Sequence, residues 1–174
     1  MPATAATNVP QLASPPISIR PAQADDCDAI VRMIRALAAY QGVAERVTAK
    51  VDNLRRDGFG PERKFEALIA ESGGRPVGLA IFQGHYSSWD GATSLQITDL
   101  FVDEIVRGTG VGFSLVREVG RIARDRGCAG LQLNMVHANP SRVSLDRMGF
   151  AHQDDLLHYR LDAHGLKTLM EMER

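Results

Sequence analysis

The first periodic part of the chain, residues 17–62, predicts one strand followed by two helices. The segment "ISIRPAQADD" (17–26) alternates apolar and polar residues and then offers aspartates that can cap a helix. Thr48 can cap a second helix, which carries Val51 and Leu54 and is ended by "RDGFGPE". The first helix is indicated by apolar residues at three- and four-residue intervals before Gly42: Ala29, Ile30, Met33, Ile34, Leu37 and Ala38.

The middle of the chain predicts three strands and a helix. "KFEALIAES" and "RPVGLAIFQGHY" surround the turn "SGG" as the arms of an antiparallel hairpin, and "SLQITDLFVD" is the next strand. A helix over 110–126 and a strand over 130–136 follow. A short helix from Pro140 to Met148, a late strand "LLHYRLD" (156–162) and a C-terminal helix or tail complete the order. Hairpins mixed with crossover helices predict a fold that contains both α and β structure (α/β in the broad sense, α+β class). Its central sheet is expected to be mixed, mostly antiparallel and flanked by helices.

Length and composition favour one globular domain. The chain has 174 residues, 44% of them hydrophobic and 24% charged, and its formal net charge of −1 gives no general reason to expect nucleic acid or a membrane as a partner. Residues 1–16, with four prolines, are expected to be a disordered leader, residues 17–162 the domain, and residues 163–174 a C-terminal helix or tail. We expect a cytoplasmic protein in which Cys27 and Cys128 are reduced thiols.

Three alternating glycines at the junction of a strand and a helix carry the strongest chemical signal. Gly108, Gly110 and Gly112 follow a strand that ends near Asp103. Glycine in a first helical turn costs up to ~1 kcal/mol relative to alanine, but it lets successive N–H groups approach one anion in front of the helix dipole. Arg107 directly before them adds a permanent positive charge. A ligand that carries phosphate explains the junction most simply.

Spacing separates this loop from other phosphate loops. A P-loop needs a Lys-Ser/Thr pair where Phe113 and Ser114 stand, and the dinucleotide fingerprint needs a glycine at position 113. The alternative that the glycines only make a tight turn stays open. The pattern that remains is R-x-x-G-x-G, formed by Arg107, Gly110 and Gly112.

In this setting the pattern resembles the coenzyme A pyrophosphate loop of the GCN5-related N-acetyltransferase (GNAT) superfamily. The resemblance extends from about Ile17 to Leu161 in the same element order, through "ISIRPAQADD", "PVGLAIF", "DLFVDEIVRGTGVGFSLV" and "SLDRMGF". Within the superfamily, "LRRDGFGPERKFEALIAE" followed by "YSSWDGATSLQITDLFV" is most similar to the diamine and thialysine acetyltransferase branch.

The resemblance implies an acetyl-CoA-dependent N-acetyltransferase. Its acceptor would be a primary amine of a small molecule (a polyamine, an amino acid or a xenobiotic amine), attacking directly in a ternary complex that leaves coenzyme A as product. The fourth strand would bind the pantetheine arm and the glycine loop the diphosphate. The implied cofactor-binding residues are Leu100, Phe101, Val102, Arg107, Gly108, Thr109, Gly110, Val111, Gly112, Asn139 and Ser141.

The sequence departs from the family pattern where the acid and the base usually stand. The branch's glutamate position is Thr98, which leaves Asp99, and the position of the tyrosine that usually protonates the thiolate is Leu145. The usual asparagine position is Ala138, with Asn139 beside it. Other residues must therefore serve as acid and base if the chain catalyses the reaction.

Asp99 is the candidate base. In the run Leu95, Ile97, Asp99, Phe101, strict alternation places Asp99 on the face that holds the apolar residues. A carboxyl group with a raised pKa there would suit a base that acts through water. The alternatives are that a bulge turns Asp99 outward, or that it caps a neighbouring backbone group.

Five further residues are candidates for catalysis or substrate binding because of their positions in the sequence. His137 ends a predicted strand near the expected place of the thiol, and Ser144 adjoins Leu145 and could relay a proton through water. His85, Trp89 and Asp90 are candidates for substrate binding, with Trp89 as a wall of the amine site and Asp90 attracting a cationic amine. Structural roles for these side chains stay open, and no metal site is expected.

Other functions also stay open. The missing tyrosine and glutamate would fit a coenzyme A-binding sensor with weak or no turnover, and a protein N-acetyltransferase is a further alternative. A purely structural module would bind no coenzyme A. The expected partners are a small-molecule amine and, because dimers are common in the resembled branch, a second copy of the chain.

Overall fold

The computed structural model describes residues 16–136, 139, 141–154 and 157–172. These residues belong to two compact units, 1–137 and 138–174. The expected leader lies outside the described residues except for Pro16, and the expected domain boundaries stay predictions. Among the described residues, no helix combines the length and the apolar character needed to cross a membrane.

The first unit holds a five-stranded sheet and three α-helices among its described residues. The strands are β1 (Ile17–Pro21), β2 (Glu66–Ser72), β3 (Arg75–Ser87), β4 (Ala92–Val102) and β5 (Leu131–Leu133). The helices are α1 (Cys27–Tyr40), α2 (Val51–Phe59) and α3 (Val111–Asp125), and the short 3₁₀ turns are η1 (Ala24–Asp26), η2 (Ala44–Arg46) and η3 (Glu104–Val106).

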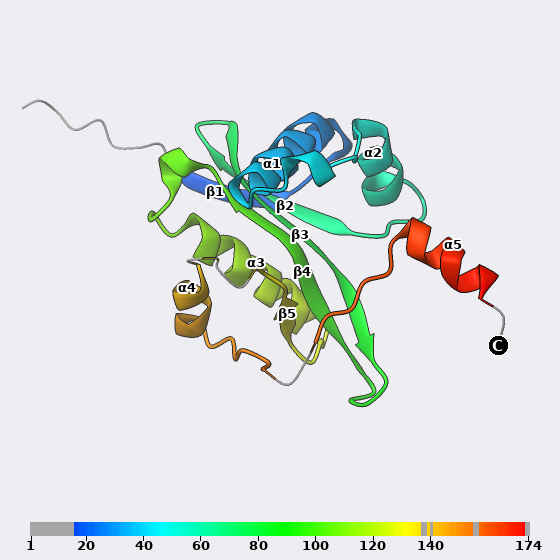
Figure 1. Cartoon of the computed structure of the whole chain (residues 1–174). Helices are drawn as coiled ribbons and strands as arrows, with labels where there is room; N and C mark the ends of the chain where they lie inside the picture. The colour runs from blue at the N-terminus through cyan, green and yellow to red at the C-terminus, as the bar shows by residue number, and fades with distance from the viewer. Residues whose placement is uncertain (1–15, 137–138, 140, 155–156, 173–174) are drawn as a thin grey trace, which may run out of the picture. The chain divides into compact units, whose positions relative to one another are not determined.

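The sheet is mixed and mostly antiparallel, as predicted. Its strand order is β1-β2-β3-β4-β5, in which β1 to β4 pair antiparallel and β5 pairs parallel to β4. Helices α1 and α2 cover one face and α3 covers the other (Figure 1). The predicted order of strand, two helices, three strands, helix and strand is therefore confirmed in this unit, although β5 is shorter than the expected 130–136.

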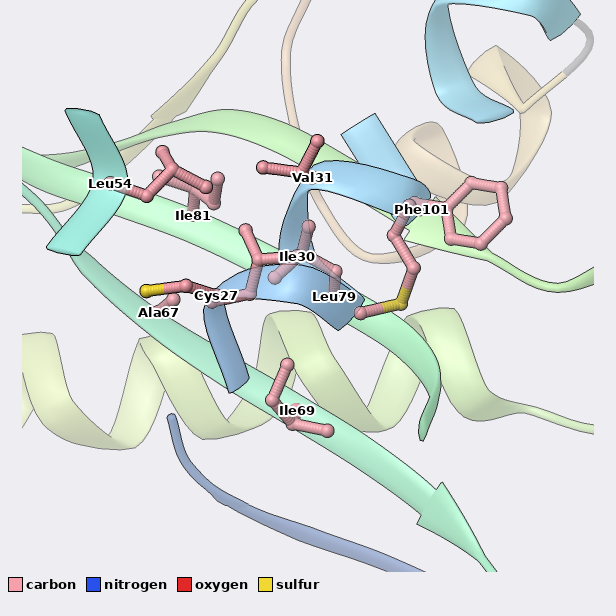
Figure 2. Close-up of a cluster of buried hydrophobic side chains, with 10 residues drawn as sticks. Cys27, Ile30, Val31, Leu54, Ala67, Ile69, Leu79, Ile81 and Phe101 are labelled. Atoms are coloured by element: carbon pink, nitrogen blue, oxygen red, sulfur yellow. The ribbon is translucent and has the colours of Figure 1, made fainter. Parts of the chain in front are cut away.

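The core on the α1 side explains why α1 lies across the strands. Its apolar stripe packs on inward-facing residues of β2, β3 and β4, because burial of this stripe stabilises a helix far more than its intrinsic propensity does. Figure 2 shows Ile30 of α1 above Ile69 of β2, with Leu79 and Phe101 in the same cluster. The buried cluster consists of Cys27, Ile30, Val31, Met33, Leu54, Ala67, Ile69, Leu79, Ile81 and Phe101.

On the opposite face, the sheet approaches α3 closely at Gly78. A Cβ atom at Gly78 would lie 3.2 Å from both Leu115 Cδ1 and Val111 Cγ1. Glycine here lets the first turns of α3 pack directly on β3, and Leu115 and Val119 are fully buried. The close packing sets the position of the N-terminus of α3.

The second unit contains α4 (Arg142–Arg147) and α5 (Ala163–Glu171). Helix α4 confirms the short helix expected from Pro140 to Met148, and the C-terminal segment is a helix rather than a tail. The late strand expected over 156–162 is wrong for its described part: residues 157–162 have no strand structure and all are exposed. Alternation of Leu157, Tyr159 and Leu161 is present, but within the described residues no neighbouring strand pairs with them.

A buried carboxylate ties the first strands to the start of α1. Arg20 of β1 donates to both oxygens of Asp26 at 2.7 and 2.8 Å and to Glu71 of β2 at 2.6 Å. The backbone N–H of Gln23 also donates to Asp26, at 2.7 Å. The Arg20 hydrogen bonds are the largest cause that lowers the pKa of Asp26, and burial opposes them.

We predict that Asp26→Asn destabilises the protein by about 2–3 kcal/mol at neutral pH, because it weakens charged hydrogen bonds to a buried group. Since the pKa of Asp26 is lowered by folding, its contribution is present above its unfolded pKa of about 3.9 and is lost as the pH falls through the lower folded value. Urea unfolding at neutral and acidic pH tests this, with exposed Asp25→Asn as the control. Equal destabilisation by both variants would contradict the assignment.

Candidate active site

A β-bulge interrupts β4 directly before Asp99. Ile81 of β3 lies opposite Asp99, whereas the next residue, Phe82, lies opposite Ile97, so Thr98 is the extra residue. The Thr98 hydroxyl donates to the Asp99 carboxylate, with an Oγ1–Oδ2 distance of 3.0 Å, and lies 3.4 Å from the carbonyl oxygen of Ile81. The threonine side chain thus occupies the irregular point of the ladder.

The bulge reverses the alternation of side chains, so the expectation of strict alternation through Asp99 is wrong. Residues directly opposite each other share a face of the sheet. Asp99, opposite Ile81, therefore lies with Phe101 on the α1 side. Ile97 lies opposite Phe82 and hence on the α3 side. Asp99 still faces an apolar layer, but it is the layer under α1.

Asp99 is held in a partly dehydrated position without a cationic partner. The residue is half-buried, and no described Lys, Arg or His side chain forms an ion pair with it. Burial raises the pKa of the Asp99 carboxyl, and the hydrogen bond from Thr98 opposes this shift. A carboxylate of raised basicity can take a proton from an ammonium group more readily than an ordinary surface aspartate can.

Beyond the bulge, one edge of β4 has no neighbouring strand among the described residues. Strand β5 pairs only with Leu95, Gln96 and Ile97, while β4 continues to Val102. The Asp103 N–H donates to the Val77 carbonyl on the β3 side at 2.8 Å. By the alternation of an antiparallel ladder, the N–H groups of Leu100 and Val102 then point to the open edge.

Phe101, the third residue expected to bind the pantetheine arm, is oriented differently. It pairs with Leu79 of β3, so its N–H and C=O point towards β3, and its side chain is buried in the α1-side cluster. The open edge is therefore formed by the backbone groups of alternate residues after the bulge, Leu100 and Val102.

The turn after β4 begins with a local cap. The Asp103 carboxylate accepts the Ile105 N–H at 3.3 Å, and η3 follows. Two amides of the next loop are used internally: Arg107 N–H donates to Glu104 at 3.2 Å and Thr109 N–H donates to Val106 at 3.4 Å. The Thr109 hydroxyl donates to the same Val106 carbonyl at 2.7 Å. Thr109 is therefore bound to η3, and its amide is not open to a ligand in this conformation.

The remaining loop amides have no acceptor among the described residues. These are the N–H groups of Gly108, Gly110, Val111, Gly112 and Phe113. Gly108 and Gly110 have φ values of 79° and 89°, in the left-handed region that favours glycine. A Cβ atom at either position would meet nothing within 4 Å, so the loop leaves open space above its amides.

The electrostatic setting of these amides favours an anion. They lie at the N-terminus of the 15-residue helix α3, whose first turn contains no acidic side chain. Arg107 directly precedes them and forms no ion pair with any carboxylate of the described residues. Open amides, helix dipole and guanidinium together form a place for a phosphate group.

The structure does not bring the three predicted substrate residues to Asp99 within this chain. Trp89 and Asp90 lie at the exposed turn of the β3–β4 hairpin, which projects from the sheet (Figure 1), and Trp89 is 98% exposed. The turn is far from Asp99, because the strand from Ala92, the first residue of β4, to Asp99 is roughly 23 Å long. His85 is exposed and pairs with Ser94, about 16 Å along the strand from Asp99. Their roles in substrate binding stay predictions.

Other predicted residues belong to the second unit or lie outside the described residues. The Asn139 side-chain oxygen accepts the Ser141 N–H at 2.9 Å, and Ser141 precedes α4. Ser144 is exposed, whereas its neighbour Leu145 is buried. His137 lies outside the described residues. Among the described residues, no cluster of His, Cys, Asp or Glu could hold a metal ion.

Tyr40 is a site residue that the sequence did not reveal. The Arg107 guanidinium lies over its ring, with 4.6 Å between the Arg107 Cζ atom and the ring centroid. Tyr40 ends α1 and is far from the loop in sequence. Within α1 it looks like any residue at the edge of the apolar stripe, so only the path of the chain discloses this contact.

Comparisons with known proteins agree with this geometry. The model of the "Acetyltransferase (GNAT) family" matches residues 31–150. Thialysine N-epsilon-acetyltransferase of Sus scrofa is 34% identical over 137 residues, which is 74% of this chain and 80% of that protein.

Solved structures show the same fold. An integron cassette protein from the mobile metagenome of V. cholerae has a TM-score of 0.73 at 20% identity, covering 90% of this chain and 98% of that one. An aminoglycoside N-acetyltransferase in complex with CoA has a TM-score of 0.69 at 20% identity, covering 88% of this chain and 98% of that one.

We predict that Asp99 makes stability fall as the pH rises. Because its pKa is raised by folding, the folded protein binds this proton more tightly, and the free energy of unfolding decreases from about pH 4 upwards until the raised pKa is passed. Asp99→Asn keeps an acceptor for Thr98 but cannot ionise, so its free energy of unfolding should fall less over this range. Urea titrations of wild type, Asp99→Asn and exposed Asp90→Asn measure the effect. Parallel pH curves for wild type and Asp99→Asn would refute it.

Proposed function

This chain belongs to the acetyltransferase (GNAT) family, and from that premise we propose that it transfers an acetyl group to a primary amine of a small molecule. As a family member it is an acetyl-CoA-dependent acetyltransferase. The proposed acceptor is a polyamine, an amino acid or a xenobiotic amine, which attacks directly in a ternary complex. The name of the thialysine N-epsilon-acetyltransferase relative supports an acceptor of this size and chemistry.

The single observation that carries the proposal is the continuity of β4 and its loop. Beyond the bulge, β5 leaves one edge of β4 uncovered, and the same strand leads directly into open amides at the N-terminus of α3. A cofactor with an amide-bearing arm and a diphosphate needs both features, side by side. The open space above Gly108 and Gly110 fits the close approach of the diphosphate.

The residues proposed to hold acetyl-CoA follow from these features. The backbones of Leu100 and Val102 would pair with the pantetheine arm as an added strand does. The diphosphate would contact Arg107 and the open amides of Gly108, Gly110, Val111 and Gly112. Asn139 and Ser141 stay proposed as further cofactor contacts.

Two tasks fall to the chain's own groups during acetyl transfer. Acetyl-CoA supplies the acetyl group as a thioester, which an unprotonated amine attacks. A backbone N–H on the open edge of β4, at Leu100 or Val102, would donate to the acetyl oxygen as negative charge develops there. Asp99 would accept the proton of the amine, directly or through one water.

Protonation of the departing thiolate needs a group other than the usual tyrosine. Leu145 stands at that position and has no proton to give. Ser144 is proposed to relay a proton through water, and His137 is proposed as the other candidate. His85, Trp89, Asp90 and a homodimer stay proposals for acceptor binding and assembly.

A second candidate function is a coenzyme A-binding sensor with little turnover. The observation that favours it is the buried, apolar Leu145 at the tyrosine position, together with Thr98 at the glutamate position. Such a sensor would use the same loop and the same strand edge without consuming an amine.

Gly110→Asp tests the cofactor loop. We predict that it abolishes the rise in melting temperature caused by coenzyme A, because a side chain and a negative charge would occupy the place of the phosphate. At a hundred times the dissociation constant, the wild-type gain should be about 2.7 kcal/mol.

Gly74→Asp is the matched control. Gly74 has a φ of 77° and open space at its Cβ position, as Gly110 does, but it lies in the β2–β3 turn. Both variants should lose similar stability without ligand, and only Gly110→Asp should lose the response to coenzyme A. A normal response of Gly110→Asp would overturn the loop assignment.

An amine panel tests turnover. We expect wild type to release thiol from acetyl-CoA with at least one diamine, amino acid side-chain amine or aminoglycoside, and Asp99→Asn to lower kcat by about 10²-fold or more. Coenzyme A affinity should be unchanged in Asp99→Asn. In wild type, the acid limb of kcat/KM should lie above the usual range of an aspartate, since burial raises the pKa of Asp99, and the variant should lack it. Tight coenzyme A binding without turnover on any amine would favour the sensor.

A further inference from the structure

The guanidinium of Arg107 is held in two ways before any ligand binds. Its Nε donates to the Val102 carbonyl at 3.1 Å, which fixes the edge of the guanidinium plane to the end of β4. Its carbon lies 4.6 Å from the centroid of the Tyr40 ring, well within the ~6 Å range of cation–π contacts. The Nε edge of the group and one side of its carbon atom are therefore in contact with protein.

The two terminal nitrogens of Arg107 have no partner among the described residues. Other arginines of the described chain use these atoms on carboxylates: Arg20 on Asp26 and Glu71, and Arg126 on Glu66. Arg107 is held instead by a neutral carbonyl and a neutral ring. No carboxylate of the described residues neutralises the positive charge of Arg107. Its two terminal nitrogens can therefore bind two oxygens of a phosphate.

The contact with Arg107 gives a reason for an aromatic residue at position 40. It is the last residue of α1 and its ring is half-exposed, at 49%. It is outside the buried cluster under α1, and its hydroxyl has no hydrogen-bond partner among the described residues. The face of the Tyr40 ring contacts the Arg107 guanidinium.

We infer that Tyr40 is a positioning residue for the cofactor: it holds Arg107 ready for the diphosphate and joins α1 to the glycine loop. This inference rests on the proposed function, because it assumes that the loop binds coenzyme A. A free arginine side chain has many rotamers and loses them on binding, whereas a side chain already held by Val102 and Tyr40 loses fewer. Preorganisation of this kind strengthens binding without any contact between Tyr40 and the ligand.

A double-mutant cycle on coenzyme A affinity tests the inference. Calorimetry with the full chain would compare wild type, Tyr40→Leu, Arg107→Ala and the double variant. Tyr40→Leu should weaken coenzyme A binding roughly two- to fivefold, the range expected of a partly exposed cation–π contact. In the Arg107→Ala background, Tyr40→Leu should have no further effect, because the side chain it positions is absent.

Aromatic replacements separate positioning from a general structural role. Tyr40→Phe should bind coenzyme A as wild type does, and Tyr40→Trp at least as tightly, since both retain a ring face. These two variants also test the inference if Tyr40→Leu proves unstable on its own. The control is Tyr86→Leu, the same change at an exposed tyrosine of β3, which should leave coenzyme A affinity unchanged.

The results distinguish the positioning role of Tyr40 from the proposed function. Equal weakening by Tyr40→Leu with and without Arg107, or wild-type affinity of Tyr40→Leu, would overturn the positioning role while leaving the proposed function intact. Weak binding by Tyr40→Phe would also overturn it. Absence of coenzyme A binding by wild type itself would overturn the proposed function, and the positioning role with it.

Discussion

The one-residue bulge at Thr98 is the constraint on which the candidate site depends. Without it, Asp99 would continue the face of Leu95 and Ile97 towards α3, and Phe101 would leave the core under α1. With it, the carboxyl group faces the α1 side, next to the strand edge that β5 leaves uncovered. A single irregular residue thus sets the face on which the aspartate lies, while the short β5 leaves the neighbouring edge of β4 uncovered.

The rest of the first unit keeps this edge and the loop in register. Gly78 lets α3 pack closely on β3, which sets where the helix begins and where its open amides lie. On the other face α1 packs over Phe101, and its last residue, Tyr40, reaches Arg107. The loop is therefore supported from both faces of the sheet. On one face α3 begins with the open amides, and from the other face the Tyr40 ring of α1 contacts the Arg107 guanidinium.

Much of the site could be predicted from local sequence, and the failures have physical causes. The glycine spacing after Arg107 predicted an anion-binding loop, because glycines without Cβ atoms let an anion approach the open amides that begin a helix. The resemblance to the acetyltransferase family, and to its thialysine branch, is confirmed. A bulge at Asp99 was one of the alternatives that the sequence left open, and local residues could not decide it, because a bulge depends on the neighbouring strand as much as on its own residue. The expected strand over 156–162 alternates correctly, yet its described part has no partner strand.

The sequence by itself determined the order of elements in the first unit and the family, and it predicted a phosphate-binding loop, since these depend on periodicity, on glycine at particular spacings and on residue identities close together in the chain. Only the tertiary structure decided which face Asp99 occupies, which of the loop amides are open, and that Tyr40 lies under Arg107. These features arise from contacts between segments far apart in sequence. The register of strand pairing and the packing of the helices produce these features, and neither can be read from a local pattern of residues.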